Sequence, residues 1–198
     1  HLREDMRHIK ETDIKRIKEN IKIPLQLEIA PTDFMINFSI RNAIKKVCIV
    51  PEKRKELTTE GGLNIKSNYS FLKKNISKLI NNNIEVSLFL DPLIDNINYS
   101  MELGVNAIEF HTGKFANAKQ EEEDKHIQLF NKVIECASNK GISVRAGHGL
   151  TYDKVKKIIH LNKIEELNIG HFIVGEAIFY GLETVVKNMK KIIDKDLK

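Results

Sequence analysis

Two histidines that adjoin glycines stand late in the chain, in the runs Ala146-Gly147-His148-Gly149-Leu150 and Leu167-Asn168-Ile169-Gly170-His171. In each run a short apolar strand is predicted to end at the histidine, and a helical pattern follows. A glycine turn at a helix N-terminus presents backbone N–H groups to a small anion, as in the phosphate sites of parallel barrels. We therefore expect His148 and His171 to lie in two phosphate-binding turns.

Two carboxylates accompany apolar strands earlier in the chain. Glu28 follows Leu25-Gln26-Leu27, and Glu109 lies within Ile108-Glu109-Phe110. Carboxylates and imidazoles grouped around one pocket are what general acid–base chemistry uses near neutral pH. Because the carboxyl ends of parallel strands converge on one face of a barrel, we expect these side chains at one substrate. The alternatives are an ion pair at the barrel rim for Glu28 and a buried structural ion pair, for instance with Arg145, for Glu109.

The two glycine-flanked histidines also have structural alternatives. His148 could serve as a capping residue, and His171 could cap a helix that begins near Phe172. Three other histidines are given no role. His111 is expected only to form a hydrogen bond with the loop at Thr112-Gly113, and His126 and His160 lie on helix patterns.

Short apolar strands alternate with helical patterns along the whole chain. The predicted strands end at Leu25–Glu28, Val47–Pro51, Val86–Asp91, Ala107–His111 and the two histidine turns. The predicted helices run from Asp13 to Asn20, Thr32 to Asn42, Asn68 to Asn81, Pro92 to Leu103, Glu121 to Lys140 and Tyr152 to His160. This alternation predicts a parallel sheet covered by helices, and the fold class α/β with a (β/α)8 TIM barrel.

Six strands are fewer than the eight of such a barrel. The chain has 198 residues and begins with His1, inside what reads as a strand end and a loop over residues 1–5. We expect residues 1–198 to be one N-terminally truncated barrel domain that lacks the first strand, the first helix and most of the second strand, roughly 40 to 45 residues, given the usual barrel length.

The composition suits a globular domain, with 41% hydrophobic and 30% charged residues. The net charge of +5 comes from lysines dispersed over helix faces without interleaved aromatic residues, which favours phosphorylated small molecules over nucleic acid. No apolar stretch is long enough to cross a membrane. Cys48 and Cys136 are predicted to be reduced core residues, which favours a cytoplasmic location.

Five runs, in chain order, go beyond a generic barrel. They are His1-Leu2-Arg3-Glu4-Asp5-Met6-Arg7-His8, Pro51-Glu52-Lys53-Arg54 with Thr58-Thr59-Glu60-Gly61-Gly62, Glu109-Phe110-His111-Thr112-Gly113, Ala146-Gly147-His148-Gly149-Leu150-Thr151-Tyr152 and Leu167-Asn168-Ile169-Gly170-His171. Together they resemble the pyridoxine 5′-phosphate synthases of deoxyxylulose-dependent vitamin B6 synthesis.

The resemblance implies condensation of 3-amino-2-oxopropyl phosphate with 1-deoxy-D-xylulose 5-phosphate to give pyridoxine 5′-phosphate, inorganic phosphate and water. It implies no organic cofactor, no metal and a homo-octamer. On the family's pattern the catalytic residues are two proton acceptors, a proton donor and a transition-state stabiliser: His1, Glu28, His148 and Glu109, respectively. The pattern assigns the pentulose phosphate to Arg3, His8 and Thr58, and the aminoketone phosphate to Gly149, Gly170 and His171.

The chain departs from the family in two places. It has no Asn-x-Asp-His motif, which in the family's first strand touches both substrates, and Arg145 stands where a small polar residue is expected. The long charged segment Pro51–Leu63 is expected to be a lid on the catalytic face, where it would exclude water from reactive imines.

Two other functions are compatible with these residues. A non-catalytic phosphate-binding barrel would keep the histidine turns but has no need for carboxylates in the pocket. A metal-dependent sugar-phosphate isomerase or epimerase could draw ligands from separate strands, although none of the candidate ligands has the close helical spacing of a zinc site. Those ligands would be His1, His8, Glu28, His111, His148 and His171.

Overall fold

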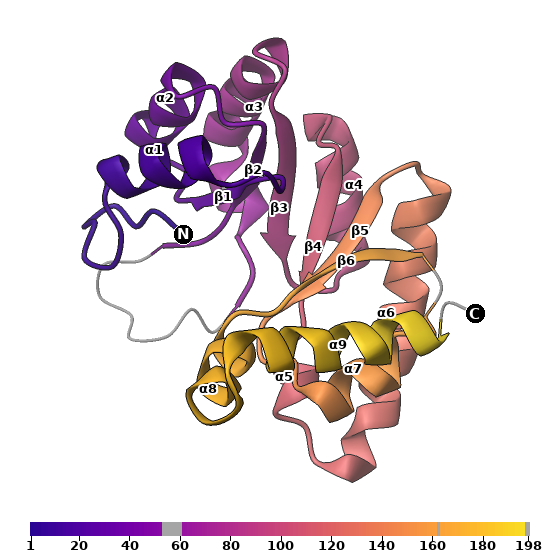
Figure 1. The fold of residues 1–198 in the computed structure, drawn as a ribbon. Helices are drawn as coiled ribbons and strands as arrows, with labels where there is room; N and C mark the ends of the chain where they lie inside the picture. Colours follow the sequence, from indigo (N-terminus) through magenta and orange to yellow (C-terminus); the bar gives the residue numbers. More distant parts are fainter. Residues whose placement is uncertain (53–60, 162, 197–198) are drawn as a thin grey trace. The chain divides into compact units, whose positions relative to one another are not determined.

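The computed structural model describes residues 1–52, 61–161 and 163–196 (Figure 1). The chain divides into two compact units, His1–Glu109 and Phe110–Lys198. Strand β4 (Ala107–His111) crosses the boundary between them.

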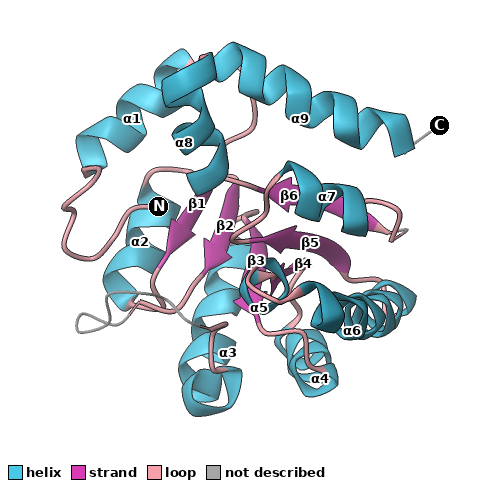
Figure 2. Cartoon of the chain, turned by 90° about the horizontal axis from the view of Figure 1, so that it is seen from below, coloured by secondary structure: helices cyan, strands magenta, loops and turns pink. Residues whose placement is uncertain are grey.

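The first unit alternates strands and helices. Parallel strands follow one another in chain order: β1 (Gln26–Ile29), β2 (Lys46–Ile49), β3 (Glu85–Leu90) and the start of β4. The helices are α1 (Glu11–Asn20), α2 (Asp33–Arg41), α3 (Ile65–Asn81) and α4 (Ile94–Leu103). Figure 2 shows α2 and α3 on one side of these strands.

Local sequence explains where these elements start and which faces they bury. The Thr32 side chain accepts a hydrogen bond from the Met35 N–H at the start of α2, and the Asn64 side chain accepts one from the Ser67 N–H at the start of α3. In the sheet, Glu28 is in register with Cys48, and Cys48 with Ser87. Because side chains alternate along a strand, these three residues share one face of the sheet. Apolar neighbours, among them Leu27, Ile29, Val47 and Ile49, are buried on the opposite face.

The second unit contains the end of β4, then β5 (Ser143–Gly147) and β6 (Ile164–Asn168), again parallel and in chain order. Its helices are α5 (Gly113–Ala116), α6 (Gln120–Asn139), α7 (Tyr152–Ile158), α8 (His171–Tyr180) and α9 (Leu182–Asp196). The Phe115 and Phe130 rings pack edge to face, with centroids 6.0 Å apart, in its buried core.

The predicted alternation of parallel strands and helices is confirmed, and the six predicted strands and six predicted helices are present within a few residues of their expected positions. The short α5 and the C-terminal α9 were not predicted. The expectation of an apolar last strand is wrong, because β6 carries Glu165 and Glu166 and has no buried residue. Closure into an eight-stranded barrel and a single domain over residues 1–198 stay predictions.

Candidate active site

The first unit brings together His1 and Glu28. Leu2, fully buried, donates its backbone N–H to the Glu28 carbonyl oxygen at 3.2 Å, which fixes the start of the chain beside β1. This backbone hydrogen bond leaves the His1 Nδ1 atom 3.8 Å from a Glu28 carboxylate oxygen. The His1 side chain is 26% exposed and the Glu28 side chain 38%, so both groups are accessible to a small molecule.

A third group, Glu52, completes this cluster. Its carboxylate lies 3.1 Å from His1 Nε2 and 3.8 Å from the Arg3 guanidinium. The imidazole therefore has a carboxylate near each of its nitrogens. Such a cluster of imidazole and carboxylates can accept and pass on protons.

The loop that follows His1 contains ion pairs between Asp5 and two arginines. Asp5 lies 3.4 Å from the Arg3 guanidinium and 3.7 Å from that of Arg7. Partial burial raises the pKa of Asp5, but the hydrogen bond from the Arg7 backbone and the two arginine charges outweigh it, so that this pKa is lowered overall. His8 is exposed, and the described residues offer it neither a hydrogen bond nor an ion pair.

Glu109 is buried in β4, and its carboxylate accepts a hydrogen bond from the Cys48 thiol at 3.7 Å. The expectation of a buried core residue is confirmed for Cys48, whereas Cys136 is only partly buried. Only 3% of Glu109 is exposed, so the electrostatic interactions of its side chain are weakly screened by water.

In the second unit, His148 lies in a strained turn directly after β5. Its φ is +83°, and that of Gly149 is +77°. A left-handed conformation costs a residue with a side chain of the order of 1–3 kcal/mol and persists only where neighbours hold it. Here Thr112 does so: its hydroxyl donates to the carbonyl oxygens of Gly147 (2.7 Å) and His148 (2.6 Å), and its N–H also donates to Gly147 (2.8 Å).

His111 accompanies His148 in this site. The two rings meet edge to face with centroids 4.8 Å apart, and His111 is buried whereas His148 is exposed. A side chain at Gly113 would place its Cβ only 2.6 Å from His111 Nε2 and 3.2 Å from the His148 ring, so the pair needs a glycine there.

The second histidine turn follows β6. Gly147 and Asn168 are paired across β5 and β6, so that Gly149 and Gly170 each lie two residues beyond neighbouring strand ends. The cap of α8 is Gly170, without a side-chain hydrogen bond, and His171 is the first helical residue. The alternative in which His171 caps a helix from Phe172 is therefore wrong.

Arg145, the departure from the family's pattern, is a buried residue of β5. Its guanidinium lies 3.6 Å from the Glu166 carboxylate, and the two residues are register partners across β5 and β6 next to an irregularity in the pairing. The larger side chain is thus accommodated with a charged partner on the neighbouring strand.

A buried ion pair ties α7 to α5 and α6 beneath this site. The Lys154 ammonium donates to Glu123 (2.7 Å) and to the Phe115 carbonyl oxygen (3.0 Å), and Lys157 also contacts Glu123. Hydrogen bonds first from Lys154 and then from Lys157 hold the pKa of Glu123 below its ordinary value, against the opposing effect of burial.

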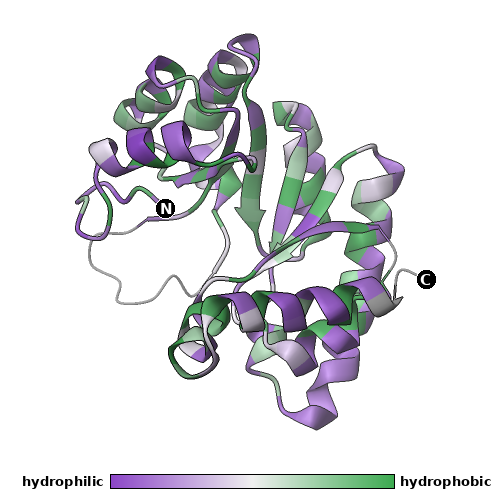
Figure 3. Cartoon of the chain, viewed as in Figure 1, coloured by the Kyte–Doolittle hydropathy of each residue, from purple (hydrophilic) through white to green (hydrophobic). Residues whose placement is uncertain are grey.

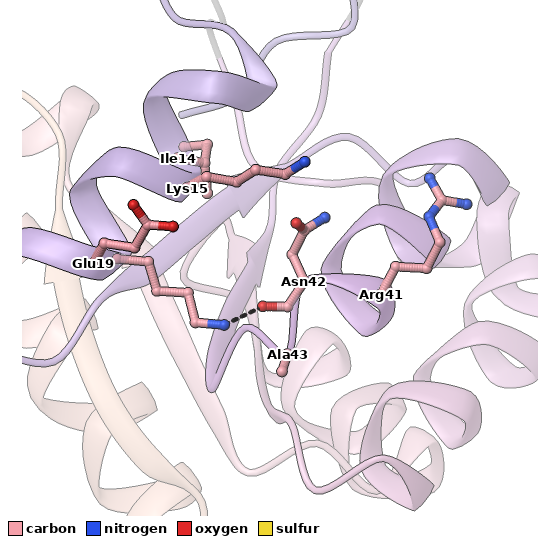
Figure 4. Close-up of a pocket in the computed structure, with 7 residues that line it drawn as sticks. Ile14, Lys15, Glu19, Arg41, Asn42 and Ala43 are labelled. Atoms are coloured by element: carbon pink, nitrogen blue, oxygen red, sulfur yellow. Dashed lines mark hydrogen bonds between the residues drawn. The ribbon is translucent and has the colours of Figure 1, made fainter.

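A cavity of about 330 Å³ lies apart from the strand ends, between α1 and the end of α2 (Figure 4). Inside it the Lys18 ammonium contacts the Asn42 carbonyl oxygen. Its lining consists of Ile14, Lys15, Lys18, Glu19, Arg41, Asn42 and Ala43, and none of these is a predicted site residue.

Some predictions fall outside the described residues, namely Thr58 and most of the lid expected over residues 51–63. Within residues 1–52, 61–161 and 163–196, no group of three or more histidine, cysteine or acidic side chains is arranged to hold a metal ion. In the same part of the chain, no helix combines the length and apolar composition needed to span a membrane.

Sequence reasoning missed three residues: Glu52, which contacts His1, and His111 and Thr112, which contact His148. The signal that marked Glu28, a carboxylate just after an apolar strand, also holds for Glu52 after Val47-Cys48-Ile49-Val50-Pro51. His111 ends β4 in the same way, but nothing local indicates that it meets His148.

The fold defines a class of protein: an α/β protein of alternating parallel strands and helices, with an imidazole–carboxylate cluster in its first unit and a histidine pair in its second. Two solved structures resemble the fold. One chain of the Amycolatopsis orientalis BexX/CysO complex matches with a TM-score of 0.59 at 12% identity, over 93% of this chain and 72% of that one. A xylose isomerase domain protein from Planctomyces limnophilus matches with a TM-score of 0.53 at 10% identity, over 86% of this chain and 71% of that one.

Sequence comparison identifies the family. The profile described as "Pyridoxal phosphate biosynthesis protein PdxJ" matches residues 1–195. Curated relatives called pyridoxine 5′-phosphate synthase include those of Prochlorococcus marinus strain MIT 9312, 48% identical over 98% of this chain and 81% of the relative, and Ehrlichia ruminantium strain Welgevonden, 44% identical over 100% and 82%. The chain belongs to the PdxJ family of pyridoxal phosphate biosynthesis proteins.

Proposed function

We propose that this protein is a pyridoxine 5′-phosphate synthase, which condenses 3-amino-2-oxopropyl phosphate with 1-deoxy-D-xylulose 5-phosphate to pyridoxine 5′-phosphate, inorganic phosphate and water. One observation carries the proposal beyond family membership. The two groups that the family resemblance makes proton acceptors, His1 and Glu28, lie 3.8 Å apart at one strand end.

Ring formation from an amine and two carbonyl compounds requires an imine, dehydrations and loss of phosphate, and these steps all move protons at atoms next to carbonyl groups. His1 and Glu28 accept protons in this scheme, and the exposed His148 donates them. The buried carboxylate of Glu109 stabilises positive charge that develops in the transition state. These steps use the chain's own side chains, without an organic cofactor or a metal.

Two groups of residues bind the phosphates in this proposal. Arg3, with His8 and Thr58, holds the pentulose phosphate through charge and, for the guanidinium, a planar pair of donors. Gly149, Gly170 and His171 hold the aminoketone phosphate. Support for the second assignment comes from the adjacent strand ends of β5 and β6 and from the start of α8 at His171, since a helix N-terminus favours an anion.

We also propose that the protein is a cytoplasmic homo-octamer. Helix α8 supports an assembly, because none of its residues is buried and Ile178 and Phe179 are each 79% exposed. Figure 3 colours α8 as largely hydrophobic. Contiguous exposed apolar side chains of this kind are typical of surfaces that another protein covers.

A product assay tests the function. The purified protein is incubated with both phosphorylated substrates, and pyridoxine 5′-phosphate and inorganic phosphate are measured; absence of both products overturns the proposal. Glu28→Gln is expected to lose about 100-fold or more in turnover with little change in KM, whereas the exposed Glu121→Gln serves as an unaffected control. Turnover of Glu28→Gln within about threefold of the parent would exclude the acid–base role, and elemental analysis would expose a metal-dependent alternative.

A further inference from the structure

Glu52 is a buried carboxylate at the centre of the His1 cluster, and the family resemblance gives it no role. It comes two residues after the buried Val50, and only 3% of its side chain is exposed. A carboxylate that leaves water loses several kcal/mol of hydration unless donors replace it. The free energy of burying Glu52 here therefore depends on the hydrogen-bond donors and positive charges around its carboxylate.

Three groups of the N-terminal segment surround the Glu52 carboxylate. One oxygen lies 3.1 Å from His1 Nε2. The other accepts the Glu4 backbone N–H at 2.9 Å and lies 3.8 Å from the Arg3 guanidinium. Glu52 thus holds both the imidazole and the backbone that carries it.

We propose that Glu52 is a positioning residue that orients the His1 imidazole toward Glu28. The proposal rests on the proposed function in giving His1 a proton-accepting task. A carboxylate lies near each ring nitrogen, but Glu52 is within hydrogen-bond distance of Nε2 at 3.1 Å whereas Glu28 is 3.8 Å from Nδ1, so the tautomer with its proton on Nε2 is favoured. The Nδ1 atom, 3.8 Å from Glu28, is then the nitrogen with a free lone pair. A nucleophile or base oriented in turn by a third group is a recurrent arrangement in acid–base catalysis.

A purely structural Glu52 would behave differently from a positioning one. Structural anchoring of the segment needs only an acceptor for the Glu4 N–H, which a glutamine carbonyl also supplies. Orientation of the imidazole needs the negative charge as well, because a glutamine amide can present either a donor or an acceptor to Nε2. The substitution Glu52→Gln therefore separates the two roles, and Glu52→Asp keeps the charge on a shorter side chain.

The first measurement is independent of turnover. Nitrogen-15 NMR of the protein with labelled histidine reports which ring nitrogen carries the proton, and the His1 signals are assigned by their loss in His1→Gln. We expect the proton on Nε2 in the parent and in Glu52→Asp, and a mixture of tautomers in Glu52→Gln. An unchanged tautomer in Glu52→Gln, or a parent protonated on Nδ1, overturns the proposal.

The second measurement is kinetic. Glu52→Gln should lower kcat about tenfold or more with KM for both substrates within about threefold, and Glu52→Asp should recover most of kcat. The charged groups that face the imidazole are Glu28, Glu52 and, beside Glu52, Arg3. Removing the Glu52 charge destabilises the protonated ring, so the acid limb of kcat should move to lower pH by about one unit. A change in KM alone, or equal loss in both variants, overturns the proposal.

The outcomes for Glu52 and for the proposed function are distinguishable. A parent protein that forms no pyridoxine 5′-phosphate but shows the expected tautomers overturns the proposed function and leaves the orientation by Glu52 supported. A parent that forms product while Glu52→Gln leaves tautomer and kcat unchanged overturns the role of Glu52 alone. If Glu52→Gln fails to fold by circular dichroism, Glu52→Asp and the parent tautomer decide the question.

Discussion

The Thr112 hydroxyl is expected to hold His148 in its left-handed turn, and the substitution Thr112→Val removes that hydroxyl with almost no change in shape. Thr112 is 1% exposed, and its single hydroxyl proton is shared between the carbonyl oxygens of Gly147 and His148. Gly147 keeps the Thr112 N–H as a donor at 2.8 Å, so only the His148 carbonyl oxygen loses its contact from this residue.

The expected loss follows from those contacts. One shared neutral hydrogen bond contributes about 0.5–1.5 kcal/mol, and the weaker hydrogen bonding of the His148 carbonyl oxygen adds part of a further 1–3 kcal/mol. The bond to the His148 carbonyl oxygen is partly buried, so water replaces the lost donor only in part. We expect Thr112→Val to lower the free energy of unfolding by about 1–2 kcal/mol.

The assay is urea denaturation followed by circular dichroism, with Thr112→Ser as the matched control because it keeps the hydroxyl. Relaxation of the turn should also displace the His148 ring, and a displacement of about 1 Å can cost up to 100-fold in turnover. Equal stability of the valine and serine variants, to within about 0.5 kcal/mol, would refute the reasoning. A stability loss without any change in kcat would leave Thr112 a structural residue only.

Two further predictions concern stability. Hydrogen bonds from Lys154 and Lys157 lower the folded-state pKa of Glu123. The stability that these bonds contribute is therefore complete above about pH 4.3, the ordinary glutamate value, and is lost as the pH falls through the lowered pKa. Urea midpoints measured against pH should show this dependence in the parent and not in Glu123→Gln. Gly62→Ala should lose at least about 2 kcal/mol in the same denaturation assay, because its Cβ would lie 2.1 Å from the backbone nitrogen that follows β3, whereas Gly61→Ala, with its nearest atom a side-chain oxygen at 3.5 Å, should be tolerated.

The elements of this fold could be predicted because their signals are local. The start of α2 is marked by Thr32, whose side chain accepts a backbone N–H only three residues away. The strand β2 is marked by the apolar run Val47-Cys48-Ile49, which is buried throughout. In contrast, β6 contains two glutamates, so its strand character depends on pairing with β5 and is indicated locally only by the glycine turn that follows it.

The candidate site was predictable in its residue types but not in its contacts. The hydrogen bonds of Thr112 join residues 35 and 36 positions apart, and the contact of Glu52 with His1 spans 51. Such distant pairs are formed by tertiary packing, which local spacing does not encode. The positive φ of His148 is likewise imposed by its surroundings, because the preferences of histidine alone disfavour it.

The pairing of Arg145 with Glu166 restricts the order in which the two positions can change during divergence. The arginine side chain is 4% exposed and the glutamate 36%. Losing Arg145 first leaves a carboxylate that water can hydrate, at a cost closer to that of a surface pair. Losing Glu166 first removes a negative charge from beside a guanidinium that water hydrates far less than the exposed carboxylate, so this intermediate is the more costly one. A lineage that exchanges this pair for small polar residues is therefore expected to pass through sequences that retain the glutamate, and the reverse path to acquire the glutamate before the arginine.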